Sequence, residues 1–283
     1  MRALAICFTL VLGAMSSQAQ EKIYETFAST RVINNYSNEM LPQQTLEFIV
    51  AHKFGDIAGA SGGLENFFGF DNLADVRIAF EYGILDQLDV GIGRSKGVGL
   101  RTQIIDGYAK YAILSQKSSG MPLSLTFVSS IALSYAKATE NPGLISSYPR
   151  FLNRLIYTNQ LLITRQFHPR LSAQLNVGYN HRNFVDVGDE NGLLFIGAAG
   201  RARFTKMLGL LVEYNQVLNR PSDISAQAPL SVGLEILTGG HAFALHFSNG
   251  KGLNENIFIP GTNSNWLDGQ FRFGFSINRR FKL

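Results

Sequence analysis

The stretch DVRIAFEYGILDQLDVGIG, residues 75–93, decides the fold class. Apolar and polar side chains alternate along its first half, with Ile78 and Phe80 on one face and Arg77 and Glu81 on the other. The alternation resumes after a short turn, and a period of two on both sides of a turn indicates a β-hairpin. In a soluble sheet the apolar face would cover a core, whereas in a membrane barrel it would contact lipid and the charged face would line a lumen. The hairpin alone leaves both options open.

The composition favours a β-rich protein with an apolar exterior. Charged residues make up 16% of the 283 residues, less than is usual for a soluble domain, whereas glycine and phenylalanine are abundant at 28 and 21. The formal net charge is only +4, and no segment concentrates lysine and arginine. The sequence therefore gives no basis for a nucleic-acid partner.

The first twenty residues, MRALAICFTLVLGAMSSQAQ, have the parts of a secretory signal peptide. A basic Arg2 precedes an apolar run that is too short to span a bilayer, and small residues precede a cleavage site after Ala19. We therefore expect residues 1–19 to be removed on export. The single cysteine, Cys7, lies in this segment, so the mature chain would have no disulfide, no reactive thiolate and no cysteine metal site.

The rest of the chain divides into a lead-in and a series of alternating segments. Residues 20–43 are polar and without clean periodicity, and we expect them to form a periplasmic lead-in segment, with folding into the barrel mouth as the alternative. Residues 44–283 contain about twelve segments near the ten residues that a tilted strand needs to cross a bilayer. The expected strands are 44–55, 73–83, 87–95, 103–115, 122–136, 151–166, 171–182, 192–204, 208–217, 229–238, 241–249 and 268–282.

The connections between these segments alternate between long and short. DIAGASGGLENFFGFDN is long and ILD is short, and later NFVDVGDEN is long and TKM is short. Outer-membrane barrels have this arrangement, with long loops outside and tight periplasmic turns. The last segment also carries an aromatic face that includes Phe271, Phe273, Phe275 and Phe281, like the strand by which such barrels are recognised for assembly. We therefore predict an all-β, transmembrane, antiparallel up-and-down barrel of about twelve strands in the outer membrane. A soluble exported sandwich is the less favoured alternative, since alternation suits it as well.

The inward face of the predicted strands is charged, and its two signs nearly balance. A wide ion-selective pore would favour one sign, whereas opposite charges in a narrow lumen can pair. Two hypotheses follow: a narrow channel or transport-related barrel for small polar solutes, or a sealed structural or assembly barrel with a salt-bridged lumen. The lumen-lining candidates are Glu47, Arg77, Glu81, Asp89, Asp106, Lys110, Arg154, Arg201, Arg203, Glu213, Glu235, His246 and Arg272.

Catalytic and metal motifs are weak. His246 and Ser248 share one face of a strand, a spacing similar to the His-x-Ser of outer-membrane phospholipase, but there the pair faces lipid and here the alternation turns it inward. A barrel-embedded lipid hydrolase is therefore the third and least favoured hypothesis. DVGDENG, residues 186–192, clusters acids without the spacing of a calcium loop. We predict neither enzymatic activity nor a cofactor or metal.

Several blocks of the sequence resemble an uncharacterised outer-membrane β-barrel family of Bacteroidota, a domain of unknown function. They include HKFGDI, FGFDNLADVRIAFEYGI, DGYAKY, EILTGGHAFALHFSNGKGLNE and FGFSINRRF, and the resemblance runs from about Thr30 to the C-terminus. It implies a single membrane-barrel domain and assigns no activity, ligand or catalytic residue. The expected partners are outer-membrane lipid, the barrel assembly machinery and a small polar solute.

Overall fold

The computed structural model describes residues 25–97, 102–222 and 224–283. The expected signal peptide over residues 1–19, with Cys7, lies outside the described residues. Among the described residues, no helix combines the length and hydropathy needed to span a bilayer. Twelve strands make up most of this part of the chain: β1 Thr45–Phe54, β2 Leu73–Leu85, β3 Leu88–Ser95, β4 Ile104–Leu114, β5 Ser124–Ser134, β6 Leu155–His168, β7 Leu171–Arg182, β8 Gly192–Arg203, β9 Leu208–Val217, β10 Leu230–Leu237, β11 His241–Ser248 and β12 Arg272–Lys282.

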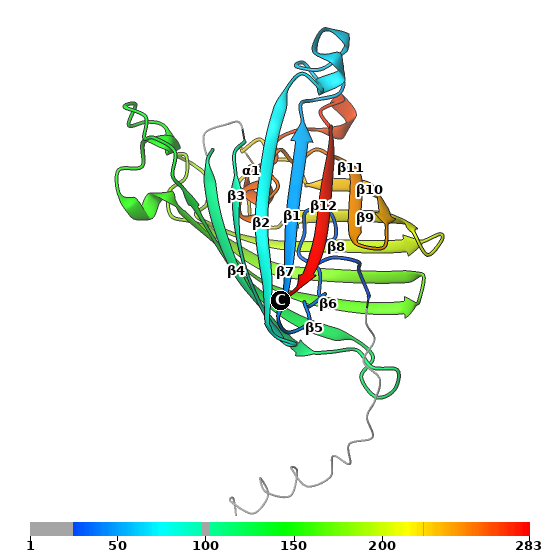
Figure 1. Ribbon diagram of the computed structural model, residues 1–283. Helices are drawn as coiled ribbons and strands as arrows, with labels where there is room; N and C mark the ends of the chain where they lie inside the picture. Colours follow the sequence, from blue (N-terminus) through cyan, green and yellow to red (C-terminus); the bar gives the residue numbers. More distant parts are fainter. Residues whose placement is uncertain (1–24, 98–101, 223) are drawn as a thin grey trace, which may run out of the picture.

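The strands form one closed antiparallel barrel in which each strand pairs with its neighbour in sequence (Figure 1). The cylinder closes where β1 pairs with β12, in a register that runs from Thr45 opposite Lys282 to Lys53 opposite Gly274. The predicted fold class, strand number and topology are confirmed. The strand bounds differ from the alternating segments by a few residues, most at the start of β6 and β12, where 3-10 turns replace the first expected strand residues.

The side-chain alternation separates the two faces of the wall. In β2, Arg77 and Glu81 are 3% and 0% exposed, whereas Ile78 and Phe80 are 45% and 47% exposed. The hairpin of residues 75–93 therefore turns its charged face into the barrel and its apolar face outward. The same pattern on the other strands gives the outer wall a continuous cover of exposed leucine, isoleucine, valine and aromatic side chains, which is what lipid contact requires.

Short helical turns lie in the long connections. The β1–β2 connection holds η1 Leu64–Gly69 and rises furthest at the upper end in Figure 1. The others are η2 Ile145–Ser147, η3 Phe151–Arg154, α1 Glu255–Gly261 and η4 Trp266–Asp268. No sequence pattern predicts α1, which Asn254 caps by accepting a hydrogen bond from the Asn256 N–H.

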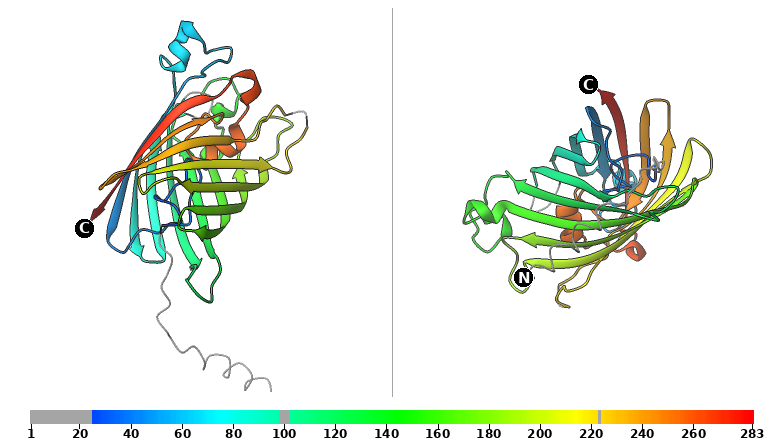
Figure 2. Two further views of the ribbon diagram at one scale, coloured as in Figure 1. Left: turned by 90° about the vertical axis from the view of Figure 1, so that its right-hand side faces the viewer. Right: turned by 90° about the horizontal axis from the view of Figure 1, so that it is seen from below.

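Two segments from outside the strands occupy the interior (Figure 2). The first, residues 25–44, is called here the inner segment; it enters from the end of the barrel that carries the short turns. Its residues 29–37 are all buried, and Ser37 N–H donates to Thr30 O at 2.9 Å to close a tight hairpin-like loop. The second, residues 249–262 of the connection between β11 and β12, is called the inner loop; it enters from the opposite end and brings α1 into the barrel.

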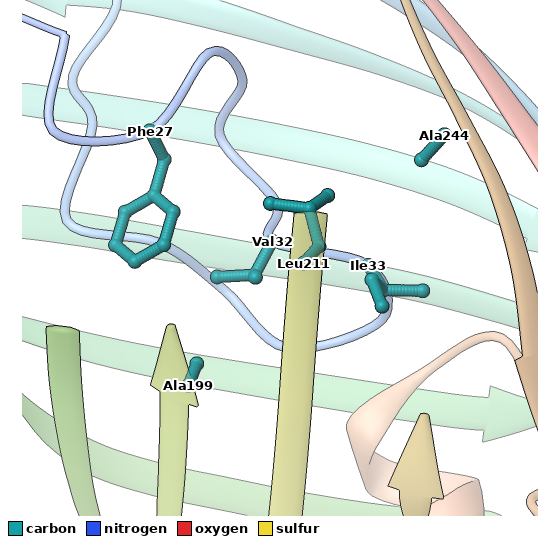
Figure 3. Packing of buried hydrophobic residues seen from close by; sticks show 6 residues of the cluster. All are labelled: Phe27, Val32, Ile33, Ala199, Leu211 and Ala244. Carbon is teal, nitrogen blue, oxygen red and sulfur yellow. The ribbon is translucent and has the colours of Figure 1, made fainter. Parts of the chain in front are cut away.

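A small apolar cluster anchors the inner segment to the wall. Phe27, Val32 and Ile33 pack against Ala199, Leu211 and Ala244 of the facing strands (Figure 3). All six side chains are at most 6% exposed. Their burial supplies one hydrophobic part of the attachment, and Tyr36 supplies another by packing against Tyr108, Val128 and Leu162.

Candidate functional site

Eleven of the thirteen predicted lumen side chains are buried inside the barrel, and the other two lie at its ends, Arg154 in the turn η3. Arg154 and Arg203 are partly exposed. The Arg154 guanidinium donates to Ser134 O and Ala136 O at the long-loop end, and that of Arg203 lies 3.9 Å from Glu25 at the other. The others are at most 4% exposed: Glu47, Arg77, Glu81, Asp89, Asp106, Lys110, Arg201, Glu213, Glu235, His246 and Arg272.

Three ion pairs among the predicted lumen side chains join strands of the wall. The Arg77 guanidinium lies 2.5 Å from an Asp106 oxygen, and the Arg201 guanidinium lies 2.7 Å from Glu235. The Lys110 ammonium is 3.4 Å from Asp89 on the neighbouring strand. These pairs link strands one or two places apart in the sheet, so they stiffen the wall, and the inner segment and inner loop fill the space between its opposite sides.

Glu213 on β9 is the main anchor of the inner segment. Its carboxylate accepts hydrogen bonds from three consecutive backbone N–H groups, those of Ile33 at 3.3 Å, Asn34 at 3.0 Å and Asn35 at 3.0 Å. The Asn34 side-chain amide adds a fourth donor. Hydrogen bonds to a charged acceptor are stronger than neutral ones, so this one side chain fixes the tip of the inner segment.

Other wall carboxylates hold the rest of the segment. Glu47 accepts from the Thr30 hydroxyl at 2.6 Å and from the Arg280 guanidinium at 3.0 Å. Asp89 accepts from the Leu41 N–H at 3.0 Å in addition to its ion pair. These acids therefore bind residues spread along the whole buried part of the inner segment.

Arg31 is the only cation among residues 25–44, all of which the structure describes. Its guanidinium lies 3.6 Å from Glu81 and 3.6 Å above the ring of Tyr36. The Tyr108 ring of β4 is 5.9 Å away on another side. A carboxylate and aromatic faces are the groups that stabilise a buried guanidinium, so the wall and the segment together form a cation site that the chain itself fills.

The inner loop is held mainly by wall cations and amides. The Lys53 ammonium donates to Gly250 O at 3.0 Å and Gly252 O at 2.8 Å. Asp75 accepts from the Leu253 N–H at 3.0 Å, and the Asn256 amide donates to Ile156 O at 3.2 Å. The wall thus offers acids to the inner segment, whereas it holds the inner loop both through donors such as Lys53 and through acceptors such as Asp75 and Ile156 O.

The two segments meet at Glu255 of α1. One of its oxygens accepts from the Tyr36 N–H at 2.8 Å, and the other is contacted by the Gln160 amide of β6. Burial raises the pKa of Glu255 to about 7, against the lowering effect of Arg31 and of these two hydrogen bonds. A single carboxyl therefore joins the inner segment to the inner loop.

Cavities lie at both ends of the barrel. A cavity of about 410 Å³ lies beside α1 at the long-loop end, lined by residues that include Asp75, Arg182, Arg220 and Ile257. A second, of about 260 Å³, lies at the short-turn end beside Leu41. The inner segment and α1 lie between them, so in this conformation the two cavities are separated.

The catalytic alternative finds little support in the geometry. His246 and Ser248 both point inward and are 1% exposed. The Ser248 hydroxyl accepts from the Ser231 hydroxyl at 3.0 Å, whereas neither ring nitrogen of His246 makes a hydrogen bond within the described residues. A nucleophile and its base need to be within hydrogen-bond reach. In the same part of the chain, no three histidine, cysteine or acidic side chains gather to hold a metal ion.

Sequence reasoning misses α1 and leaves open how deeply the inner segment enters the lumen. The segment reads as a polar lead-in, although Val32, Ile33, Tyr36 and Leu41 are apolar residues set at intervals in it. Those apolar residues, all at most 6% exposed, are the one local signal that could suggest burial.

Comparison with known proteins gives one family and a set of distant structures. The model of the family described as "Membrane bound beta barrel domain (DUF5777)" matches residues 27–281. No curated protein matches the chain. The NanC porin is 8% identical over 84% of this chain and 100% of its own, with a TM-score of 0.49, and the KdgM porin is 7% identical over 84% and 99%, also at 0.49. The Acinetobacter baumannii outer membrane protein Omp33 is 8% identical over 85% and 99%, at 0.43.

Proposed function

The chain belongs to the family of membrane-bound beta barrel domains matched over residues 27–281, and from this premise we propose that it is an outer-membrane protein that passes small polar solutes through a lumen closed by its own segments. The family membership confirms the membrane barrel expected from the sequence. The outer membrane, the non-enzymatic role and the Bacteroidota origin remain proposals. The roles of the lumen residues and the partnership with the barrel assembly machinery are also proposals.

The observation that carries this proposal is the polar attachment of the inner segment. Glu47, Asp89 and Glu213 hold it through hydrogen bonds to backbone N–H and hydroxyl groups. Once the inner segment has moved away, water can donate to the same carboxylates. Each hydrogen bond therefore stabilises the closed state by only about 0.5–1.5 kcal/mol net, or somewhat more at a charged group. The wall side chains behind the inner segment are polar, so water can hydrate them when the inner segment moves away.

The cavity of about 410 Å³ at the long-loop end supports the same proposal. Its lining combines ion-paired side chains, such as Arg182 with Asp189 at 2.8 Å, with apolar ones such as Ile257. A space of this size and mixed polarity suits a small polar solute. In the proposed orientation, with the long loops outside, this cavity is the outer vestibule of the pathway.

The second candidate is a sealed structural barrel, and the filled lumen favours it. Residues 29–37 are at most 8% exposed, and α1 packs Phe258 and Ile259 against Phe195 of the wall. In that case the inner segment and inner loop are permanent parts of the core, and the long loops would provide the contacts with partners.

A planar-bilayer recording distinguishes the two candidates. The Asn34 amide donates to the Ser231 hydroxyl at 3.0 Å, so a short bifunctional thiol reagent can join Asn34→Cys to Ser231→Cys in a Cys7→Ser background. A gated pathway predicts discrete openings before treatment and silence after it. Ser231→Cys with Ser248→Cys, opposite each other on β10 and β11, provides the control whose crosslink leaves the openings intact. Silence of the untreated, correctly folded protein at all voltages would favour the sealed barrel.

A further inference from the structure

Removal of the inner segment would leave the wall with an excess of unpaired negative charge. Asp106, Asp89 and Glu235 keep their wall partners Arg77, Lys110 and Arg201. Glu81 and Glu213 have no such partner: within the described residues, Glu81 pairs only with Arg31, and Glu213 accepts hydrogen bonds only from Ile33, Asn34 and Asn35.

The buried wall cations offset this only in part, because each of them keeps its own partners when the inner segment leaves. The Lys53 ammonium remains bound to carbonyl groups of the inner loop. Arg272 remains bound to Asn249 O at 2.8 Å and to Asp56. Release of the inner segment alone therefore frees two buried carboxylates and no buried cation. Arg203, which would lose Glu25, is partly exposed at the end of the barrel.

The pair between Arg31 and Glu81 is loose for a buried ion pair. Its closest nitrogen–oxygen distance is 3.6 Å, and neither Glu81 oxygen makes a hydrogen bond, although Glu81 is 0% exposed. Two of the Arg31 nitrogens, Nε and Nη2, also lack a hydrogen-bond partner. A buried carboxylate without hydrogen bonds retains much of its desolvation cost, so another cation that approaches more closely can replace this guanidinium.

We propose that Glu81, with the neighbouring ring of Tyr108, and Glu213 form a cation-recognising surface of the lumen wall, which Arg31 and the N–H groups of Ile33–Asn35 occupy in the closed state. The inner segment then acts as a tethered substitute for a cationic solute. The released pathway prefers cations, including solutes with ammonium or guanidinium groups, over anions, because the exposed fixed charges are negative. This inference rests on the proposed function, since it applies only to a lumen that opens.

The test uses the full-length chain in planar bilayers under a potassium chloride gradient. The Arg31→Ala variant removes the tethered cation and leaves both carboxylates. We expect it to open more often than the wild type and to shift the reversal potential toward the potassium equilibrium potential. Arg170→Ala, which neutralises an exposed turn arginine, is the matched control and should behave as the wild type does.

The decisive comparison adds Glu81→Gln and Glu213→Gln to Arg31→Ala. The reversal potential should then move back toward zero, whereas Glu140→Gln, at an exposed loop position, should leave it unchanged. The inference would be overturned, and the proposed function left standing, if Arg31→Ala preferred anions or if Glu81→Gln and Glu213→Gln left the reversal potential unchanged. Silence of every variant, each with the gel mobility of a folded barrel, would reject the proposed function itself. Should Arg31→Ala not fold, the reversal potential of the wild-type openings is compared with that of Glu81→Gln, and an unchanged value would overturn the inference in the same way.

Discussion

At the scale of single residues, Glu213 has the greatest influence on the state of the lumen. One carboxylate receives three consecutive backbone N–H groups of the inner segment from a strand about 180 positions away in the chain. Because these N–H groups are buried, no water molecule replaces the carboxylate as their acceptor when Glu213 is substituted. The side chain therefore controls the local stability of the segment more than any single apolar contact does.

Replacing Glu213 with alanine should loosen the inner segment without unfolding the barrel. Loss of hydrogen bonds to a charged acceptor costs about 1.5–3 kcal/mol, which corresponds to roughly a tenfold to hundredfold faster amide exchange. Hydrogen exchange of residues 33–35 measures it directly. Glu140→Ala, at an exposed loop position, should leave that exchange unchanged. Unaltered protection in Glu213→Ala would show that the other contacts of the segment, such as those of Glu47 and Asp89, hold it without Glu213.

Glu255 should make the docking of α1 depend on pH. Burial raises its pKa from 4.5 to about 7, so the docked carboxyl keeps its proton over a range in which an undocked one has lost it. The docked state is therefore fully favoured below about pH 4.5 and loses stability as the pH rises through about 7. The side-chain oxygen of Gln160 has no hydrogen-bond partner among the described residues. When the Gln160 amide group is turned over, this oxygen takes the place of the nitrogen beside Glu255 and accepts a hydrogen bond from the protonated carboxyl.

Hydrogen exchange of residues 255–261, corrected for the intrinsic effect of pH, checks this expectation. Protection should fall between about pH 5 and about pH 8 in the wild type. In Glu255→Gln, which is neutral throughout, it should stay constant. The same pH dependence in both proteins would assign the effect to another group.

At the scale of the strands, glycines make room for aromatic rings inside the wall. Gly91 lies opposite Tyr108, and Gly178 lies opposite Phe195. A Cβ atom at Gly178 would lie 2.3 Å from the Phe195 ring, and one at Gly91 would lie 2.2 Å from the Tyr108 ring. The rings lie flat over these glycines, which lets the wall pack closely against the inner segment and α1.

Gly178→Ala should consequently destabilise the barrel by about 1–3 kcal/mol, the usual cost of overpacking a filled interior. Gly200→Ala is the matched control, because its Cβ would meet only an ordinary contact at 3.8 Å. The temperature at which the folded form disappears from an unboiled gel compares the two. Equal temperatures for the two variants would mean that Phe195 moves aside at little cost.

At the scale of the whole molecule, the outer wall determines where the protein resides. Leu175, near the middle of β7, is 58% exposed and has lipid as its expected neighbour, whereas Leu267 in η4 is 93% exposed in a long connection. An arginine in the middle of the lipid face costs about 2–4 kcal/mol.

Leu175→Arg should therefore reduce folding into lipid vesicles, while Leu267→Arg should have little effect. Denaturant titration of refolding into the same vesicles measures both. If the two substitutions cost the same, the middle of β7 would not be in contact with hydrocarbon.

The sequence by itself determined the wall of this protein. Alternation with a period of two is a local property of each strand, and a bilayer requires one face of every strand to be apolar, so residues such as Arg77 and Ile78 could be assigned to opposite faces before any contact was known. The alternating lengths of the connections then fixed the antiparallel order of the strands. For the same reason most strand bounds could be placed to within a few residues.

Only the tertiary structure decided what fills the lumen and which charges remain free there. The inner segment has no periodicity, and its position depends on contacts such as that of Asn34 with Glu213, which lie 179 residues apart. The strand alternation could show that Glu81 and Glu213 point inward, but not that the chain supplies its own Arg31 and backbone N–H groups to meet them. Hydrogen bonds between distant segments depend on where the closed barrel places each wall side chain, and no local pattern in the sequence encodes that placement.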